Sequence, residues 1–229
     1  MIDCVRPWLA QMDSSVTPEL VLTSYAFMKW RHEQPRPAML FTELMRRCWV
    51  DLEGTFGFPA TPERAERFAA SIGDWPPFED SVRALTYLSS HYKLAILSNI
   101  DNASIEKSKQ LLRAPFILTV TAEDVGSYKP GLAHFEEAFR RFDGLGIRRD
   151  EILHVAQSKY HDIAPANGLE LPSVWVNRRH GKPGTGATIA AEATPNLTVN
   201  SLAELVALHQ SRGGDGSAWE LSAEAGRAD

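Results

Sequence analysis

The sequence LAILSNID, residues 94–101, decides how the second half of the chain folds. Its apolar run is too short for a helix and is typical of a strand buried in a parallel sheet. The polar residues that follow, from Ser98 to Asp101, mark the end of that strand and the start of a helix. The stretch therefore predicts a β-strand that is followed directly by a helix, the repeating unit of an α/β fold.

Strands and helices alternate after this stretch. Short apolar runs predict further strands at residues 116–119, 152–156, 173–177 and 197–198. Apolar residues at helical spacing predict helices between them, at residues 103–113, 132–142, 160–167 and 202–208. Strands that alternate with helices form a parallel sheet covered on both faces, and ligands of such sheets bind at the carboxyl ends of the strands. We therefore expect an α/β fold with a doubly wound parallel sheet.

The first ninety residues carry only helical patterns. The triplet TPE occurs at residues 17–19 and again at 61–63, and it combines a capping hydroxyl, a proline at the first helical position and an acidic residue that suits the helix dipole. Helices are expected to begin at both triplets and near residues 38 and 79. The predicted domains are a helical module at residues 1–77, an α/β core at residues 78–210 and a disordered tail at residues 211–229.

The composition excludes several classes of protein. The chain has 229 residues, 44% of them hydrophobic, and a formal net charge of −5. A general nucleic-acid-binding protein is excluded because no basic stripe is present to neutralise phosphates. Two cysteines, Cys4 and Cys48, are too few for a disulfide framework. Because no apolar run reaches the length of a membrane helix and no signal pattern opens the sequence, we expect a cytoplasmic protein with no membrane or nucleic-acid partner.

Polar residues lie at two junctions between a predicted strand and the helix that follows it. Ser98 and Asn99 follow the strand of the opening stretch and offer hydroxyl, amide and backbone N–H donors to an anionic group. Lys129 precedes a proline at a helix entrance, where its ammonium can balance a carboxylate or a developing negative charge. Taken singly, Ser98 and Asn99 are more typical of ordinary helix capping, and Lys129 is more typical of a solvated surface lysine.

A third polar group follows the strand predicted at residues 152–156. It begins at Ser158 and includes Asp162, which can position a water molecule or accept a metal. An aspartate near a helix start is also favourable with the dipole alone, and His161 is interpreted as a packed or exposed ring. The order of the three groups, each at the carboxyl end of a successive strand, is what indicates a site.

Three stretches resemble a known family: LAILSNID (94–101), VGSYKPGLAHFEEAF (125–139) and ILHVAQSKYHDIAPANGLELPSVWVNRR (152–179). Together they resemble the haloacid dehalogenase superfamily, and in particular the branch of the type II L-2-haloacid dehalogenases. The resemblance covers about residues 79–179. The helices before it resemble the four-helix cap that this branch inserts between the first strand and the rest of its core.

The resemblance implies a role for each group. In that family an aspartate after the first strand attacks the substrate and forms an ester, which water then hydrolyses. Ser98, with Asn99 beside it, resembles the hydroxyl residue that binds the carboxylate or phosphate of the substrate. Lys129 resembles the lysine that orients the nucleophile, and Asp162 resembles the acidic residue at the far end of the site. Ser158 is included as a candidate substrate-binding residue.

Two positions depart from the family pattern. Phe135 stands where the dehalogenases carry a tyrosine near the nucleophile. Gln157 stands where the phosphatase branches carry an acidic residue that helps to hold magnesium, and the loss of one anionic ligand weakens such a site. Because the dehalogenases' usual serine and asparagine are here Gln157 and Lys159, the choice between the branches stays open. The resemblance favours no cofactor, with a weak magnesium site as the alternative.

The expected nucleophile motif, Asp-x-x-Gly-Thr after an apolar strand, is not found before Thr17. Residues 51–55, DLEGT, fit its letters, but Asp51 continues an amphipathic helix, and it lies only 47 residues before Ser98 (98 − 51 = 47). We therefore reject Asp51 as the nucleophile. Without the first strand, the centre of the sheet is expected to be incomplete, and the activity depends on an upstream motif.

Three functions are compatible with these residues. The first is a hydrolase that cleaves a small 2-halo carboxylic acid, or a similar anionic small molecule, through an aspartyl ester. The second is a small-molecule phosphatase of the same superfamily, which predicts magnesium dependence. The third is a non-catalytic binding protein that keeps the fold. A homodimer is expected from the resemblance alone.

Overall fold

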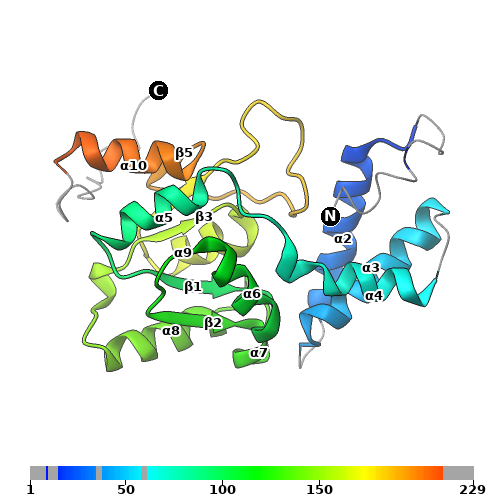
Figure 1. Ribbon diagram of the computed structural model, residues 1–229, viewed down its shortest axis with the longest axis horizontal. Coiled ribbons are helices and arrows are strands. Elements are labelled where there is room, and N and C mark those ends of the chain that lie inside the picture. Colours follow the sequence, from blue (N-terminus) through cyan, green and yellow to red (C-terminus); the bar gives the residue numbers. More distant parts are fainter. Residues whose placement is uncertain (1–8, 10–14, 35–37, 58–60, 214–229) are drawn as a thin grey trace.

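The computed structural model describes residues 9, 15–34, 38–57 and 61–213. Two groups of elements lie side by side (Figure 1): the helices of residues 18–70, and the strands with the helices that cover them. We call the first group the helical module. No helix in the described ranges is long and apolar enough to cross a membrane.

The helical module begins where the sequence predicts. Its helices are α2 (Pro18–Glu33), α3 (Phe41–Phe56) and α4 (Pro62–Ala70). The side chains of Thr17 and Thr61 accept hydrogen bonds from the backbone N–H groups of Leu20 and Arg64, at 3.2 and 3.3 Å. Each hydroxyl thus satisfies one of the N–H groups that a helix start leaves unpaired, which confirms both start signals.

The core of the helical module extends beyond the module itself. Trp49 is the largest side chain within it, and its ring lies 4.9 Å from the ring of Phe68. Tyr128, which follows the strands of the first sheet in sequence, packs into the same apolar cluster, and its hydroxyl donates a hydrogen bond to Met39 O at 2.7 Å. The helical module is therefore fixed to the loop that carries Lys129.

A short connection joins the module to the strands. After the 3-10 turn η1 (Ile72–Asp74), residues 75–80 lead to α5 (Ser81–Ser89). The Asp80 carboxylate accepts hydrogen bonds from Arg178 at 2.7 and 2.8 Å and from the backbone N–H of Leu202 at 2.7 Å. One carboxylate thus ties the end of this connection to the end of a strand and to the start of the last helix.

The five strands of the described residues all run parallel, in two separate sheets. They are β1 (Ala95–Ser98), β2 (Leu118–Thr121), β3 (His154–Ala156), β4 (Ser173–Val176) and β5 (Leu197–Val199). One sheet has the order β1-β2 and the other β3-β4-β5. Among the described residues, no strand pairs with the free edges of β1 and β3, which agrees with the expectation of a sheet that is incomplete at its centre.

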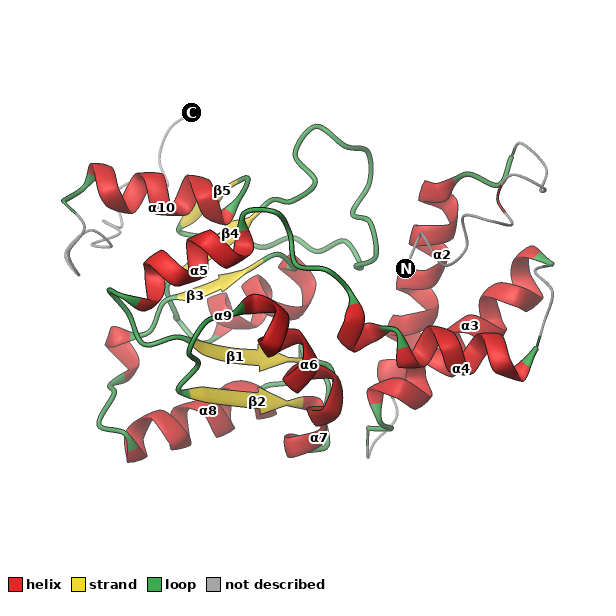
Figure 2. Ribbon diagram, viewed as in Figure 1, coloured by secondary structure: helices red, strands yellow, loops and turns green. Residues whose placement is uncertain are grey.

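Helices cover both faces of the strands (Figure 2). The remaining helical elements are α6 (Asn102–Leu112), α7 (Ala122–Val125), α8 (Ala133–Gly144), η2 (Arg149–Glu151), η3 (Lys159–Ile163), α9 (Ala164–Gly168) and α10 (Leu202–Ser211). In this view α5 and α6 lie in front of the strands, and α8 and α9 lie behind them. The doubly wound α/β fold class predicted from the sequence is therefore confirmed.

The structure adds one element and corrects two local predictions. The added element is α7, which follows β2 and begins with a capping box between Thr121 and Asp124. The helix expected at residues 160–167 starts with a π-helical turn, η3, before it becomes α9. Ser211 ends α10 and does not begin a disordered tail, and residues 214–229 of that predicted tail lie outside the described residues.

Candidate active site

Three of the predicted site residues meet at the carboxyl ends of β1 and β3. The Nζ atom of Lys129 donates to Leu97 O of β1 at 2.8 Å and to Asp162 Oδ1 after β3 at 2.5 Å. Asn99 forms two hydrogen bonds with the backbone of the same lysine. Its Oδ1 accepts a hydrogen bond from Lys129 N at 2.8 Å, and its Nδ2 donates one to Lys129 O at 3.1 Å. The lysine side chain thus links the two sheets.

The π-helical turn η3 sets the position of Asp162. The backbone N–H groups of Asp162 and Ile163 both donate to Ser158 O, at 3.1 and 3.2 Å, which fixes the wide turn. Turns of this kind are frequent at functional sites. The turn places the Asp162 carboxylate between Lys129 and His154, whose Nε2 lies 3.3 Å from Asp162 Oδ1.

Asp162 is ionised despite its burial. Burial raises the pKa of a carboxyl group, but here the positive charge of Lys129 and the hydrogen bond with His154 outweigh that effect. The pKa of Asp162 is therefore well below its usual range. The result is a buried ion pair between Lys129 and Asp162, which is costly to form but strongly destabilising to break.

The other predicted residues lie at the same strand ends. The Ser98 hydroxyl accepts a hydrogen bond from Ile100 N at 3.4 Å. The Ser158 hydroxyl caps η3: its Oγ accepts from His161 N at 3.0 Å and lies 2.9 Å from His161 Nδ1. The Asn99 carboxamide is likewise held by Lys129. Asn99 and Ser158 are thus engaged with the protein, while the roles of all three in binding substrate stay predictions.

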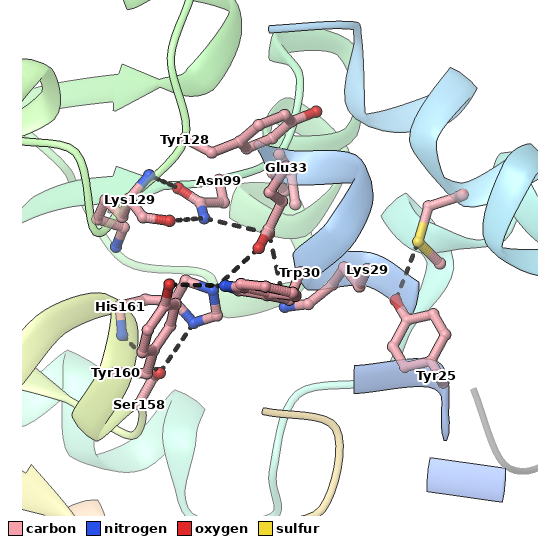
Figure 3. A network of polar contacts seen from close by, with 12 residues as sticks. Tyr25, Lys29, Trp30, Glu33, Asn99, Tyr128, Lys129, Ser158, Tyr160 and His161 are labelled. Carbon is pink, nitrogen blue, oxygen red and sulfur yellow. Dashed lines mark hydrogen bonds and ion pairs between the residues drawn. The ribbon is translucent and has the colours of Figure 1, made fainter. Parts of the chain in front are cut away.

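Sequence reasoning missed the contribution of the helical module. Glu33, the last residue of α2, is buried, and its carboxylate lies 3.2 Å from His161 Nε2 and 3.5 Å from Asn99 Nδ2 (Figure 3). His161 is therefore neither an exposed ring nor one that is merely packed. A glutamate at the end of a helix gives no sequence signal that its carboxylate is buried, or that it contacts Asn99, which lies 66 residues later in the sequence.

His134 lies beneath Ser98 and is expected to make folding sensitive to pH. Its Nε2 lies 3.1 Å from Ser98 O, while its buried Nδ1 has no hydrogen-bond partner among the described residues. Burial, with the charge of Lys129 second, lowers the pKa of His134 to about 4, from 6.5. The folded protein therefore resists a proton that the unfolded chain accepts.

We expect His134 to cost no stability above pH 6.5. As the pH falls from 6.5 toward 4, it should lower the free energy of unfolding by about 3 kcal/mol in total. His134→Gln keeps a donor for Ser98 O but does not titrate. Urea unfolding at a series of pH values should therefore give a flatter curve for the variant over this window. Identical pH dependence in the two proteins would contradict the assignment.

The positions that depart from the family pattern have structural partners. The ring of Phe135 is buried 5.1 Å from the ring of His154, so it packs behind the group that contacts Asp162. The Nζ of Lys159 lies 4.5 Å above the ring of Trp175, a cation–π distance. The backbone O of Gln157 accepts from Trp175 Nε1 at 2.9 Å.

The described residues do not fit a magnesium site. No group of three or more His, Cys, Asp or Glu side chains among them could hold a metal ion. Asp162 is already bound by the Lys129 ammonium, and position 157 offers a neutral glutamine where a second carboxylate would suit the ion better. No step of the reaction is therefore assigned to a metal, and the expected lack of a cofactor stays a prediction.

Asp51 lies within α3, as the sequence reasoning expects. Its carboxylate pairs with Arg31 and His32 of the helical module, both at 2.8 Å. It follows no strand, and this supports its rejection as the nucleophile.

Comparison with known proteins gives matches at the level of structure. No protein-family model matches the chain, and no curated protein matches it in sequence. An L-2-haloacid dehalogenase superposes with a TM-score of 0.70 and 21% identity over 92% of this chain and 91% of its own. The L-2-haloacid dehalogenase of Xanthobacter autotrophicus, with chloropropionic acid covalently bound, gives a TM-score of 0.71 and 16% identity over 91% and 92%. This chain has the haloacid dehalogenase fold.

The haloacid dehalogenase fold is shared with a second kind of protein. A HAD-hydrolase from Bacillus subtilis, bound to magnesium, gives a TM-score of 0.67 and 16% identity over 90% of this chain and 89% of its own. The likeness to both kinds concerns the fold, and the choice between their chemistries depends on the site residues of this chain.

Proposed function

We propose that this protein is a hydrolase of the haloacid dehalogenase type, acting on a small 2-halo carboxylic acid or a similar anionic molecule. The observation that carries the proposal is the buried Lys129–Asp162 pair at the carboxyl ends of β1 and β3. A fixed ammonium in this position favours an anionic nucleophile and an anionic substrate, because preorganised charge stabilises charge that develops during a reaction.

The lysine keeps one donor for the reaction. An ammonium group has three N–H donors, and Lys129 uses two of them, on Leu97 O and on Asp162. The third has no acceptor among the described residues. We infer that it binds a carboxylate nucleophile, carried by a parallel strand that fills the space between β1 and β3. That strand is not part of the described residues.

The proposed reaction has two steps. The carboxylate oxygen attacks C2 of the substrate, a C–O bond forms, and the halide leaves with the electrons of the C–halogen bond. Water then attacks the carbonyl carbon of the resulting ester, which releases a 2-hydroxy acid and restores the carboxylate. Lys129 orients the nucleophile and balances its charge, while Asp162 anchors the lysine and accepts its hydrogen bond. Ser98 is proposed to bind the substrate carboxylate.

Release of chloride from 2-chloropropionate tests this proposal. It is measured on the 229-residue chain and on a chain extended with any upstream coding sequence, with and without magnesium, and beside phosphate release from a phosphate monoester. Metal-independent chloride release that Lys129→Met abolishes is the expected result. Magnesium-dependent phosphate release would instead assign the phosphatase chemistry. If neither protein releases chloride or phosphate, the non-catalytic role is assigned instead.

A further inference from the structure

The last turn of α2 reaches the strand ends of the other group of elements (Figure 3). Glu33 lies there with 3% of its surface exposed. One of its oxygens, Oε2, lies 3.2 Å from His161 Nε2, and the other, Oε1, accepts from Asn99 Nδ2 at 3.5 Å. A single buried carboxylate therefore contacts residues that follow both β1 and β3.

Each partner of Glu33 supports one half of the Lys129–Asp162 pair. The Asn99 carboxamide holds both backbone polar groups of Lys129. His161 directly precedes Asp162 in η3. Displacement of Asn99 would release the lysine backbone, and displacement of His161 would shift the turn that aims the carboxylate.

The charged groups around the Glu33–His161 contact determine which of the two side chains carries a proton. Burial raises the pKa of Glu33, but the charge of Lys29 and the hydrogen bonds from His161 and Asn99 outweigh burial. The pKa of Glu33 is therefore lowered, and its carboxylate is ionised. Burial is the main cause that lowers the pKa of His161, against the effect of Glu33. The charged groups that face His161 are Glu33 and Lys29 from α2 and Asp162 from its own turn. A neutral ring donates to Glu33 from Nε2 and accepts the Ser158 hydroxyl at Nδ1.

A second contact crosses the same interface, and it reaches these supports only through the ring of Tyr160, which packs edge-on against His161 at 5.0 Å. The indole Nε1 of Trp30 donates to the Tyr160 hydroxyl at 2.9 Å. It comes from the same turn of α2 and contacts the same π-helical turn, but no hydrogen bond joins it to Asn99 or His161. It is therefore a matched control for the effect of the interface as such.

We propose that Glu33 is a positioning residue of the site, carried by the helical module, which holds Asn99 and His161 and through them Lys129 and Asp162. This inference rests on the proposed hydrolase function for its catalytic meaning. The arrangement of Lys129 and Asp162 then depends on how α2 packs against the strand ends.

The first test uses proteins with ¹⁵N-labelled histidine rings. In the unaltered protein at pH 7 we expect His161 to be neutral with its proton on Nε2. In Glu33→Gln the pKa of His161 should fall, because a carboxylate that favours the charged ring is removed. Trp30→Phe, and Glu43→Gln at an exposed position, should leave it unchanged. A proton on Nδ1 in the unaltered protein would overturn the proposal even if the Glu33 variant failed to fold.

The second test is amide hydrogen exchange. Glu33→Gln should accelerate exchange at residues 159–163 roughly ten- to hundredfold, the range for loss of a hydrogen bond to a charged group, and Trp30→Phe should do so less. Unchanged exchange in Glu33→Gln would overturn the proposal. In the active form, kcat for 2-chloropropionate should fall with little change in KM. Absence of turnover in every variant would refute the hydrolase function instead, and the ring and exchange measurements would still decide the role of Glu33.

Discussion

Replacement of Lys129 by methionine is expected to lower the free energy of unfolding by about 3–5 kcal/mol. The substitution keeps most of the side-chain volume and removes the ammonium, so Asp162 is left as a buried carboxylate whose remaining near partner among the described residues is His154. An uncompensated buried charge is among the most destabilising changes a fold can undergo. Urea unfolding at pH 7 measures the loss.

Two further variants make this expectation specific. Lys109→Met breaks an exposed ion pair with Glu106 and should cost less than about 1 kcal/mol. The double variant Lys129→Met, Asp162→Leu removes both charges and should recover much of the stability that the single variant loses. If Lys129→Met were as stable as Lys109→Met, the buried pair would not hold the two sheets together.

The second large effect is expected in the helical module. Trp49→Ala should lower the stability of that module by about 3–5 kcal/mol, because it leaves a cavity beside Phe68 and deprives the buried Glu53 Oε1 of the indole donor at 2.5 Å. We propose that residues 1–77 and 78–210 are separate domains. Amide exchange should then accelerate in α3 and α4 while β4 stays protected.

The exposed Trp75, whose Nε1 donates to Ser71 Oγ, offers the control. Trp75→Ala should cost about 1 kcal/mol or less. Equal acceleration of exchange in β4 and in α3 by Trp49→Ala would contradict the division, and would mean that the contact through Tyr128 makes the two parts one cooperative unit.

The fold could be predicted because its signals are local. The apolar run before Ser98 predicts β1, and the threonine caps at residues 17 and 61 predict the starts of α2 and α4. The separation of the described strands into two sheets agrees with the absence of an apolar strand pattern before Thr17. The π-helical start of η3 was not predictable, because its spacing differs from an α-helix by one residue over one turn.

The candidate site could be predicted only in part, for a geometric reason. Asn99, Lys129 and Asp162 were predicted together because parallel strands bring their carboxyl ends to one edge. Glu33 was missed because its contacts cross between two groups of elements, and no periodic pattern describes how a helix seats against a distant strand end. His154 was missed because a histidine within a predicted strand is typical of packing.

The most direct measurement of the proposed chemistry is a single turnover of 2-chloropropionate in H₂¹⁸O, by a form of the protein that carries the proposed strand with the nucleophilic carboxylate. If a protein carboxylate attacks C2 and water then attacks the ester carbonyl, the first product takes its oxygen from the protein. We therefore expect unlabelled lactate and one ¹⁸O in the nucleophilic carboxylate, found by mass spectrometry of its peptide. Labelled lactate in the first turnover, with no label in the protein, would contradict it.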